Sequence, residues 1–243
     1  MQLHIYKNTE AVIDELAKWI TDYTNYTLQK KDRFTIALSG GETPKSLYKA
    51  LSAEPYRNQI DWNKTHIFWG DERVVPFSDG KNNAKTAYDT LLNKVDLPAA
   101  NIHIMRTDLP PDIAAKEYEK ILHDYFDETG NSFDLVLLGM GKDAHTLSLF
   151  PGSVILHEDH NWVNDVFAED QKMYRITLMP SIVNKASAVI FLVTGIEKSN
   201  ALRNVLEGPF EPFKYPAQLI QPANNELYWF LDNDSSSGLR QKN

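Results

Sequence analysis

The chain has 243 residues, of which 42% are apolar and 24% charged, so it is long enough for one large α/β core or two small ones. Its formal net charge of −8 argues against a general nucleic-acid binder, because phosphate backbones require clustered lysine and arginine, although a locally positive pocket can still bind a small anion. The absence of cysteine excludes disulfides, thiolate nucleophiles and cysteine-based zinc sites.

The sequence contains no pattern typical of a membrane or secreted protein. Its first residues, MQLHIYK, lack the apolar core of a signal peptide. No apolar run approaches the roughly 20 residues that a membrane-spanning helix needs. We therefore expect a cytoplasmic protein without a membrane partner.

Helix and strand patterns alternate along the chain. Helical spacing of apolar residues predicts helices over 11–23, 44–53, 83–92, 112–126 and 198–206. Short apolar or β-branched runs predict strands over 34–38, 66–69, 102–104, 133–140, 162–167, 174–178, 188–193 and 227–231. Thr43 is expected to cap the second helix, with Pro44 at its first position.

No linker rich in glycine and serine divides these elements, so residues 1–234 are expected to form one α/β domain, followed by a polar, disordered tail over 235–243. The alternation predicts a doubly wound, mostly parallel, Rossmann-like sheet with helices on both faces. Ligands bind at the carboxyl ends of the strands in such sheets, so the polar loops that follow four of the strands predict a pocket.

The first of these loops reads SGGETPK and leads from a strand into a helix. Gly40 and Gly41 let backbone N–H groups turn toward a ligand, and a helix that starts near Glu42 and Thr43 favours negative charge at that end. Phosphate binding and an ordinary strand-to-helix turn fit this pattern equally well. The loop matches neither the P-loop nor the dinucleotide-binding glycine pattern, so no nucleotide cofactor is predicted.

Basic residues accompany the other loops. Asp71, Glu72 and Arg73 directly follow a strand, and such a cluster is more often a surface salt-bridge turn than a site. The planar fork of an arginine nevertheless suits a carboxylate, a phosphate or a developing oxyanion. Lys198 opens a helix after the most apolar strand, where it meets either an anion or solvent, and Arg175 is a cation within a strand that can face the pocket.

The segment LLGMGKDAHTLSLFPG places His145 two residues after Asp143, on a loop that begins with Gly139 and Gly141. A lone histidine is usually an ordinary polar residue. At the predicted ligand-binding edge, however, an imidazole can take a proton from water near neutral pH, which is the work of a general base. A carboxylate can orient such a ring, although the spacing alone does not decide whether Asp143 reaches it.

Other catalytic patterns are absent or incomplete. His157 and His160 resemble a metal-binding pair but lack an obvious third ligand, and Asp232 and Asp234 begin a calcium-type loop without its glycine or its glutamate. No G-x-S-x-G motif is present, which argues against a serine hydrolase. Neither a metal nor a covalent nucleophile is predicted.

Five segments occur together over 37–202: LSGGETPKSLY, FWGDERVVPFSDGKNN, FDLVLLGMGKDAHTLSLFPG, RITLMPSIVNKA and LVTGIEKSNAL. In this order they resemble the 6-phosphogluconolactonase family, which shares its fold with glucosamine-6-phosphate deaminase. GDERVVP and HTLSLFPG are similar to the lactonase branch, whereas the deaminase branch has D-E-Y and H-I-A-F-N-E-P at these places.

The resemblance implies hydrolysis of 6-phospho-D-glucono-1,5-lactone in the oxidative pentose phosphate pathway, without cofactor, metal or covalent intermediate. It implies a general base at His145, oriented by Asp143, and stabilisation of negative charge by Arg73. The implied phosphate and substrate contacts are Gly40, Gly41, Glu42, Thr43, Asp71, Arg175 and Lys198.

One departure from the family pattern is Ala144, because the family usually has glycine directly before the histidine. We expect an ordinary backbone conformation there, since alanine with a positive φ would cost about 1–2 kcal/mol. Two alternative functions remain at this point: a deaminase in which Asp71 abstracts a proton from C2 of an amino-sugar phosphate, and a non-catalytic sugar-phosphate-binding protein. The oligomeric state is open between a monomer and a small homo-oligomer.

Overall fold

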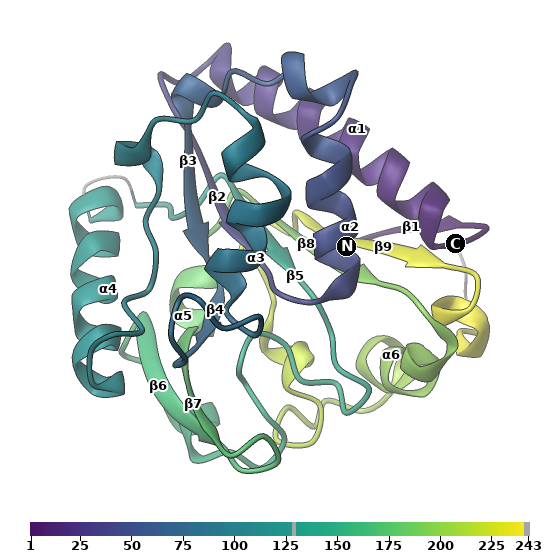
Figure 1. Cartoon of the computed structure of the whole chain (residues 1–243). Helices are drawn as coiled ribbons and strands as arrows, with labels where there is room; N and C mark the ends of the chain where they lie inside the picture. Colours follow the sequence, from purple (N-terminus) through teal and green to yellow (C-terminus); the bar gives the residue numbers. More distant parts are fainter. Residues whose placement is uncertain (128–129, 241–243) are drawn as a thin grey trace.

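The structure of the chain, a computed structural model, describes residues 1–127 and 130–240. Its main sheet is parallel throughout and has six strands in the order β1-β9-β8-β5-β2-β3 (Figure 1). These strands span Gln2–Tyr6 (β1), Leu227–Asp232 (β9), Ala188–Val193 (β8), Leu135–Leu138 (β5), Phe34–Leu38 (β2) and Thr65–Trp69 (β3). The predicted parallel α/β architecture is therefore confirmed.

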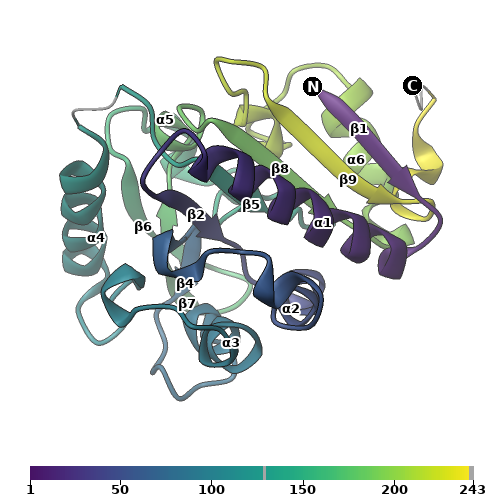
Figure 2. The same cartoon turned by 90° about the horizontal axis from the view of Figure 1, so that it is seen from above.

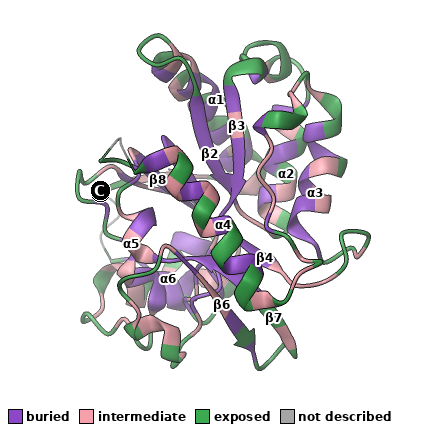
Figure 3. Cartoon of the chain, turned by 90° about the vertical axis from the view of Figure 1, so that its left-hand side faces the viewer, coloured by how far each residue is buried: buried purple, intermediate pink, exposed green. Residues whose placement is uncertain are grey.

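Helices cover both sides of this sheet. They are α1 (Thr9–Leu28), α2 (Glu42–Leu51), α3 (Asn83–Thr90), α4 (Pro111–Phe126), α5 (Pro180–Val183) and α6 (Ser199–Glu207). Figures 2 and 3 place α2 and α3 on one side of the strands and α5 and α6 on the other. Among residues 1–127 and 130–240, no helix is long and apolar enough to cross a membrane.

The core strands are continuous apolar runs because both of their faces are covered. Every residue of β2, β5 and β8 is buried, and Figure 3 shows this for β2 and β8. This burial explains why the strands over 34–38, 133–140 and 188–193 could be predicted from composition alone.

A second, smaller sheet is antiparallel and lies beside the carboxyl ends of the main strands. It consists of β4 (Asp71–Arg73), β7 (Met173–Leu178) and β6 (Val163–Ala168), in the order β4-β7-β6. The strands predicted over 162–167 and 174–178 are present, but they form this hairpin and do not join the parallel sheet. Four residues separate β6 from β7, and so short a connection can join only antiparallel neighbours.

Gly70 alone separates β3 of the main sheet from β4 of the small one. Its N–H donates to Leu38 O at 2.8 Å, and its carbonyl accepts the N–H of Leu178 at 2.8 Å. A side chain at this position would collide with Leu147, because a Cβ atom would lie 2.7 Å from Leu147 Cδ2. The glycine thus lets one continuous backbone cross from one sheet to the other.

Several local predictions were wrong. The strand predicted over 102–104 is only a single bridge between Ile102 and Ile67. The edge strand β1 was not predicted, because its half-exposed residues lack the apolar run of a core strand. The N-cap of α2 is Gly41 rather than Thr43, and its φ of +113° is a conformation that favours glycine.

The tail expected to be disordered from Ser235 is instead folded as far as the structure describes it. Residues Ser235–Gly238 form a 3₁₀ turn in which Ser235 and Ser236 are fully buried. Ser235 Oγ donates to Val193 O at 2.9 Å, and Leu239 joins the apolar core. This polar segment can be buried because its serine hydroxyls donate hydrogen bonds to backbone carbonyls. Residues 241–243 lie outside the described part of the chain.

Candidate active site

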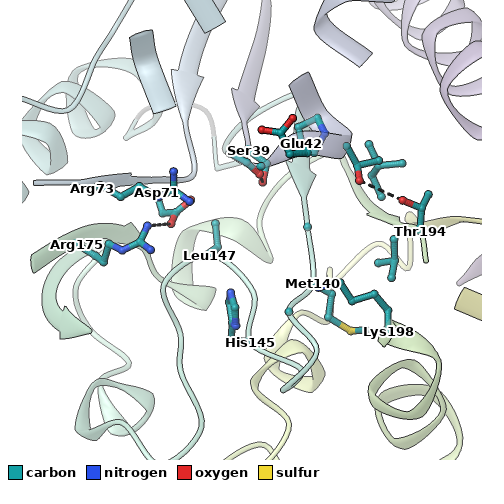
Figure 4. A pocket seen from close by; sticks show the side chains of 18 of the residues that line it. Ser39, Glu42, Asp71, Arg73, Met140, His145, Leu147, Arg175, Thr194 and Lys198 are labelled. Carbon is teal, nitrogen blue, oxygen red and sulfur yellow. Dashed lines mark hydrogen bonds and ion pairs between the residues drawn. The ribbon is translucent and has the colours of Figure 1, made fainter. Parts of the chain in front are cut away.

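A cavity of about 300 Å³ lies where the loops after the central strands meet the small sheet (Figure 4). Nine of the ten predicted site residues line it: Gly40, Gly41, Glu42, Thr43, Asp71, Arg73, His145, Arg175 and Lys198. The tenth, Asp143, does not line the cavity but contacts His145. The rule that ligands bind at the carboxyl ends of parallel strands therefore located the cavity correctly.

The predicted site residues did not include the other residues that line the cavity, which are Ser39, Pro44, Gly139, Met140, Gly141, Leu147, Gln171, Leu192, Val193 and Thr194. Most of them adjoin predicted residues in the same loops. Gln171 is different, because it comes from the turn between β6 and β7, and no local pattern signals that this turn reaches the cavity.

The loop that carries His145 is tightly closed on itself. The N–H of Gly141 donates to His145 O at 2.8 Å, and Thr146 Oγ1 donates to Gly139 O at 2.8 Å. Gly141 has no room for a side chain, because a Cβ atom there would lie 2.1 Å from His145 Nδ1 and 2.3 Å from Asp143 Oδ1. This glycine therefore lets the backbone pass directly beside the imidazole and its carboxylate partner.

Asp143 does reach the histidine. Its Oδ1 atom lies 2.5 Å from His145 Nδ1 and also accepts the N–H of His145 at 3.3 Å. Burial on its own raises the pKa of Asp143, but the hydrogen bonds from His145 outweigh it and hold the pKa below its ordinary value. The carboxylate therefore stays charged and favours a proton on Nδ1. Among the described residues Nε2 has no hydrogen-bond partner, and His145 lines the cavity.

The expectation of an ordinary backbone at Ala144 was wrong, because its φ is +65°. Ala144 is fully buried and completes the turn between Gly141 and His145, with its N–H donating to Gly141 O at 3.0 Å. Its carbonyl accepts the N–H of Ala217 at 3.0 Å. These two hydrogen bonds hold Ala144 in a left-handed conformation, which favours glycine.

Two substitutions at Ala144 should distinguish the free-energy cost of its positive φ from the contribution of its methyl group to packing. We expect Ala144→Gly to change the free energy of unfolding by less than about 1 kcal/mol, because relief of the left-handed backbone offsets the lost methyl group and the greater freedom of the unfolded chain. Ala144→Val should destabilise by at least about 2 kcal/mol, because a β-branched residue is disfavoured at positive φ and has no space there. Chemical denaturation of both variants measures the difference, and a valine variant as stable as the wild type would contradict it.

Of the three residues that follow Gly70, two line the cavity and one stabilises the protein interior. Arg73 and Asp71 line the cavity, whereas the Glu72 side chain points into the protein and is buried. The Glu72 carboxylate accepts the backbone N–H groups of Asn83 and Ala84, both at 2.7 Å, and thereby satisfies the start of α3. Burial raises the pKa of Glu72 to about 7, and these N–H donors oppose that shift. Its role is structural.

Arg73 and Arg175 lie directly opposite each other on β4 and β7. Arg73 Nη1 donates to Lys81 O at 2.7 Å, and the Nε atoms of both arginines are buried without a hydrogen-bond partner among the described residues. Burial lowers the pKa of the Arg175 guanidinium, Asp71 opposes this shift, and the Arg73 cation adds to it. Two cations with unused donors beside one cavity favour the binding of an anion.

The opposite wall is formed by α2 and the loop after β8. The N-cap of α2, Gly41, makes no side-chain capping hydrogen bond, so the first N–H groups of the helix remain available to a ligand. Thr43 and Thr194 join the two loops through their hydroxyls at 3.1 Å. Figure 4 shows Lys198 and Thr194 on one side of the cavity, Arg73 and Arg175 on the other, and His145 between them.

This arrangement can bind an anionic group and present a histidine to an uncharged part of the same molecule. No cluster of three or more His, Cys, Asp or Glu side chains that could hold a metal lies within 1–127 and 130–240. The groups at the cavity that can act on a bound molecule include the imidazole of His145, the guanidinium groups of the two arginines and backbone N–H donors.

A family model described as "Glucosamine-6-phosphate isomerases/6-phosphogluconolactonase" matches residues 7–229, which is most of the chain. The chain belongs to this family. A family member from Synechocystis, named 6-phosphogluconolactonase, is 37% identical and is covered over 98% of both chains. A 6-phosphogluconolactonase from Nostoc is 42% identical over 84% of each chain.

Solved structures of other proteins have the same fold as this chain. The crystal structure of a 6-phosphogluconolactonase from Thermotoga maritima has a TM-score of 0.83 at 28% identity, over 95% of this chain and 99% of its own. A monomeric glucosamine-6-phosphate deaminase reaches a TM-score of 0.84 at only 17% identity, over 98% of this chain and all of its own, which shows a shared fold and no more. Backbone similarity therefore does not separate the two branches of the family, and the residues of the site must do so.

Proposed function

We propose that the chain is a 6-phosphogluconolactonase, which hydrolyses 6-phospho-D-glucono-1,5-lactone to 6-phospho-D-gluconate in the oxidative pentose phosphate pathway of the cytoplasm. The observation that carries the proposal is the Asp143–His145 pair on the wall of a cavity that also contains Arg73, Arg175 and Lys198. The names of the Synechocystis and Nostoc relatives support it. The substrate is a small anion, and the reaction requires no nucleic acid.

In the proposed reaction His145 Nε2 takes a proton from a water molecule as the water oxygen attacks the C1 carbonyl of the lactone. The carbonyl oxygen gains negative charge in the tetrahedral intermediate, and the Arg73 guanidinium with nearby backbone N–H groups stabilises it. The bond between C1 and the ring oxygen then breaks, and the imidazolium returns its proton to that oxygen. The product is the open-chain acid. Asp143 holds the proton on Nδ1 and so keeps the lone pair of Nε2 available.

The phosphate of the substrate would rest on the backbone of Gly40, Gly41, Glu42 and Thr43 at the start of α2. Lys198 would supply a positive charge from the neighbouring loop, and Arg175 would do so from β7. The carboxylate of Glu42 does not compete for these donors, because it is largely exposed and lies 3.4 Å from Lys45 Nζ.

The first test is direct. The lactone would be generated in situ, and its disappearance followed with and without the protein against its spontaneous hydrolysis. We expect a clear acceleration that is absent with unphosphorylated gluconolactone. If hydrolysis is not accelerated, release of ammonia from glucosamine 6-phosphate would identify a deaminase, and tight binding without turnover would identify a sugar-phosphate-binding protein.

Lys198→Ala should raise KM for the phosphorylated lactone about tenfold and leave kcat within about twofold. The reason is that a charge-assisted hydrogen bond to the phosphate contributes equally before and during the reaction. Lys116→Ala is the matched control, because Lys116 is an exposed lysine on α4. Steady-state kinetics distinguish the two variants. An unchanged KM in Lys198→Ala would remove this lysine from the phosphate site.

A further inference from the structure

Ser148 is a fully buried serine in the loop that carries His145, and the proposed reaction does not use it. Its side chain and its backbone connect that loop to the two strands of the small sheet that line the cavity. Ser148 Oγ donates to Asp71 Oδ2 on β4 at 2.7 Å, and the Ser148 N–H donates to Thr177 Oγ1 on β7 at 3.1 Å.

The same oxygen of Asp71 faces Arg175. The distance from Asp71 Oδ2 to Arg175 Nη1 is 3.7 Å, whereas a charge-assisted hydrogen bond between such groups is about 2.7–2.9 Å long. Both side chains are almost completely buried, and a buried arginine beside a carboxylate normally forms a close, two-point ion pair. The Ser148 hydroxyl donates to the same oxygen and so fixes the orientation of the carboxylate, whose distance to Arg175 Nη1 is too long for a close ion pair.

Two nitrogen atoms of the Arg175 guanidinium group, Nη1 and Nε, consequently lack a close hydrogen-bond partner among the described residues. Its Nη1 atom takes part in the long ion pair, and its Nε atom has no hydrogen-bond partner among the described residues. Its Nη2 atom donates to Gln171, an exposed residue of the β6–β7 turn. Because Arg175 lines the cavity and its Nε atom is buried, an anion would replace the contacts of the Nη atoms with Asp71 and Gln171.

We propose that Ser148 is a positioning residue whose hydroxyl keeps Asp71 from forming a close ion pair with Arg175 and so leaves the Arg175 guanidinium available to the anionic group of the substrate. The identity of that substrate rests on the proposed function. Without the hydroxyl, Asp71 Oδ2 would accept from Arg175 directly. The guanidinium would then be drawn toward β4 and partly neutralised, and the anion would bind less tightly.

A double-mutant cycle with Asp71 tests this inference. Binding of 6-phosphogluconate and of inorganic phosphate would be measured by calorimetry in Ser148→Ala, Asp71→Asn and the double variant. Ser148→Ala should weaken both ligands about tenfold and raise KM by a similar factor, with kcat within about twofold. Asp71→Asn should bind inorganic phosphate at least as tightly as the wild type, because the carboxylate that competes for Arg175 is gone. In that background, Ser148→Ala should have no further effect on binding.

Ser132→Ala is the matched control, because Ser132 is also a buried serine whose Oγ donates a single 2.8 Å hydrogen bond, to Ile182 O, away from the cavity. It should lose stability without a change in ligand binding. The proposal is overturned if Ser148→Ala binds both ligands as the wild type does, or if it weakens them equally in both Asp71 backgrounds. Should the alanine variant not fold, Ser148→Cys, with a poorer donor of similar size, is expected to weaken binding in the same direction.

The phosphate titrations need no turnover, so they separate this inference from the proposed function. If the wild type binds phosphate but does not accelerate lactone hydrolysis, the proposed function is refuted, whereas the double-mutant cycle still tests the role of Ser148. A wild type that hydrolyses the lactone while Ser148→Ala keeps its KM would refute the role of Ser148 alone.

Discussion

Replacement of His145 by alanine is expected to lower kcat for lactone hydrolysis by a factor of about 10² to 10⁴, the usual contribution of a general base. Water must then lose its proton without assistance. Binding of the product should change by less than about threefold, because the proposed phosphate contacts come from α2, Lys198 and Arg175 and do not include His145. Single-turnover hydrolysis and product calorimetry would measure the two quantities separately.

The chain provides a matched control for this variant. His123 on α4 also has a carboxylate partner, with 2.7 Å between its Nδ1 and Asp127 Oδ1, but it is not among the residues of the cavity. His123→Ala should leave kcat unchanged. Near-normal turnover in His145→Ala would end the general-base assignment even if the protein proves to be a lactonase.

Asp143→Asn should lower kcat by about a hundredfold or more while the protein remains folded. An asparagine amide can donate to Nδ1, which favours the ring tautomer with its proton on Nε2 and leaves no lone pair there for water. Asp127→Asn, which alters the other histidine–carboxylate pair, is the control. If Asp143→Asn keeps more than about a third of wild-type kcat, the carboxylate does not set the tautomer.

The same pair predicts a pH effect on stability. The pKa of Asp143 in the folded protein lies below its ordinary value of 3.8, so its contribution to stability is complete above about pH 4. It is lost as the pH falls through the lower, folded-state pKa. The difference in free energy of unfolding between the wild type and Asp143→Asn should therefore shrink below pH 4, which denaturation at several pH values would measure. A difference that grows in acid would contradict this sign.

The site residues that could be predicted from the sequence are those whose position follows from the strand next to them in the chain. Arg73 and His145 each follow an apolar strand, and the carboxyl ends of parallel strands meet at one edge, so both could be assigned to one pocket. Arg175 lies in a strand of the small sheet, and only the antiparallel register shows that it stands opposite Arg73. Gln171 lines the cavity only because the β6–β7 hairpin packs beside it, and no residue within the hairpin indicates that position.

Two further residues show that the role of a side chain depends on the backbone conformation, which the sequence alone does not give. Glu72 lies between two predicted site residues, Asp71 and Arg73, yet alternation along β4 turns its side chain to the opposite face, where it accepts the first N–H groups of α3. Ala144 was expected to avoid a positive φ on energetic grounds. The hydrogen bonds to Gly141 and Ala217 stabilise the turn sufficiently to hold an alanine there.

The single-residue junction at Gly70 has a mechanical consequence. Arg73 belongs to the small sheet, whereas the loop before α2 and the His145 loop extend from the large one, and a flexible linker between the sheets would let these walls move apart. The N–H of Gly70 instead donates to Leu38 O on β2 and its carbonyl accepts from the N–H of Leu178 on β7, so backbone hydrogen bonds join the two sheets at this residue. We therefore expect the width of the cavity to be set before any substrate arrives, so that binding free energy is not consumed in closing one half of the molecule on the other.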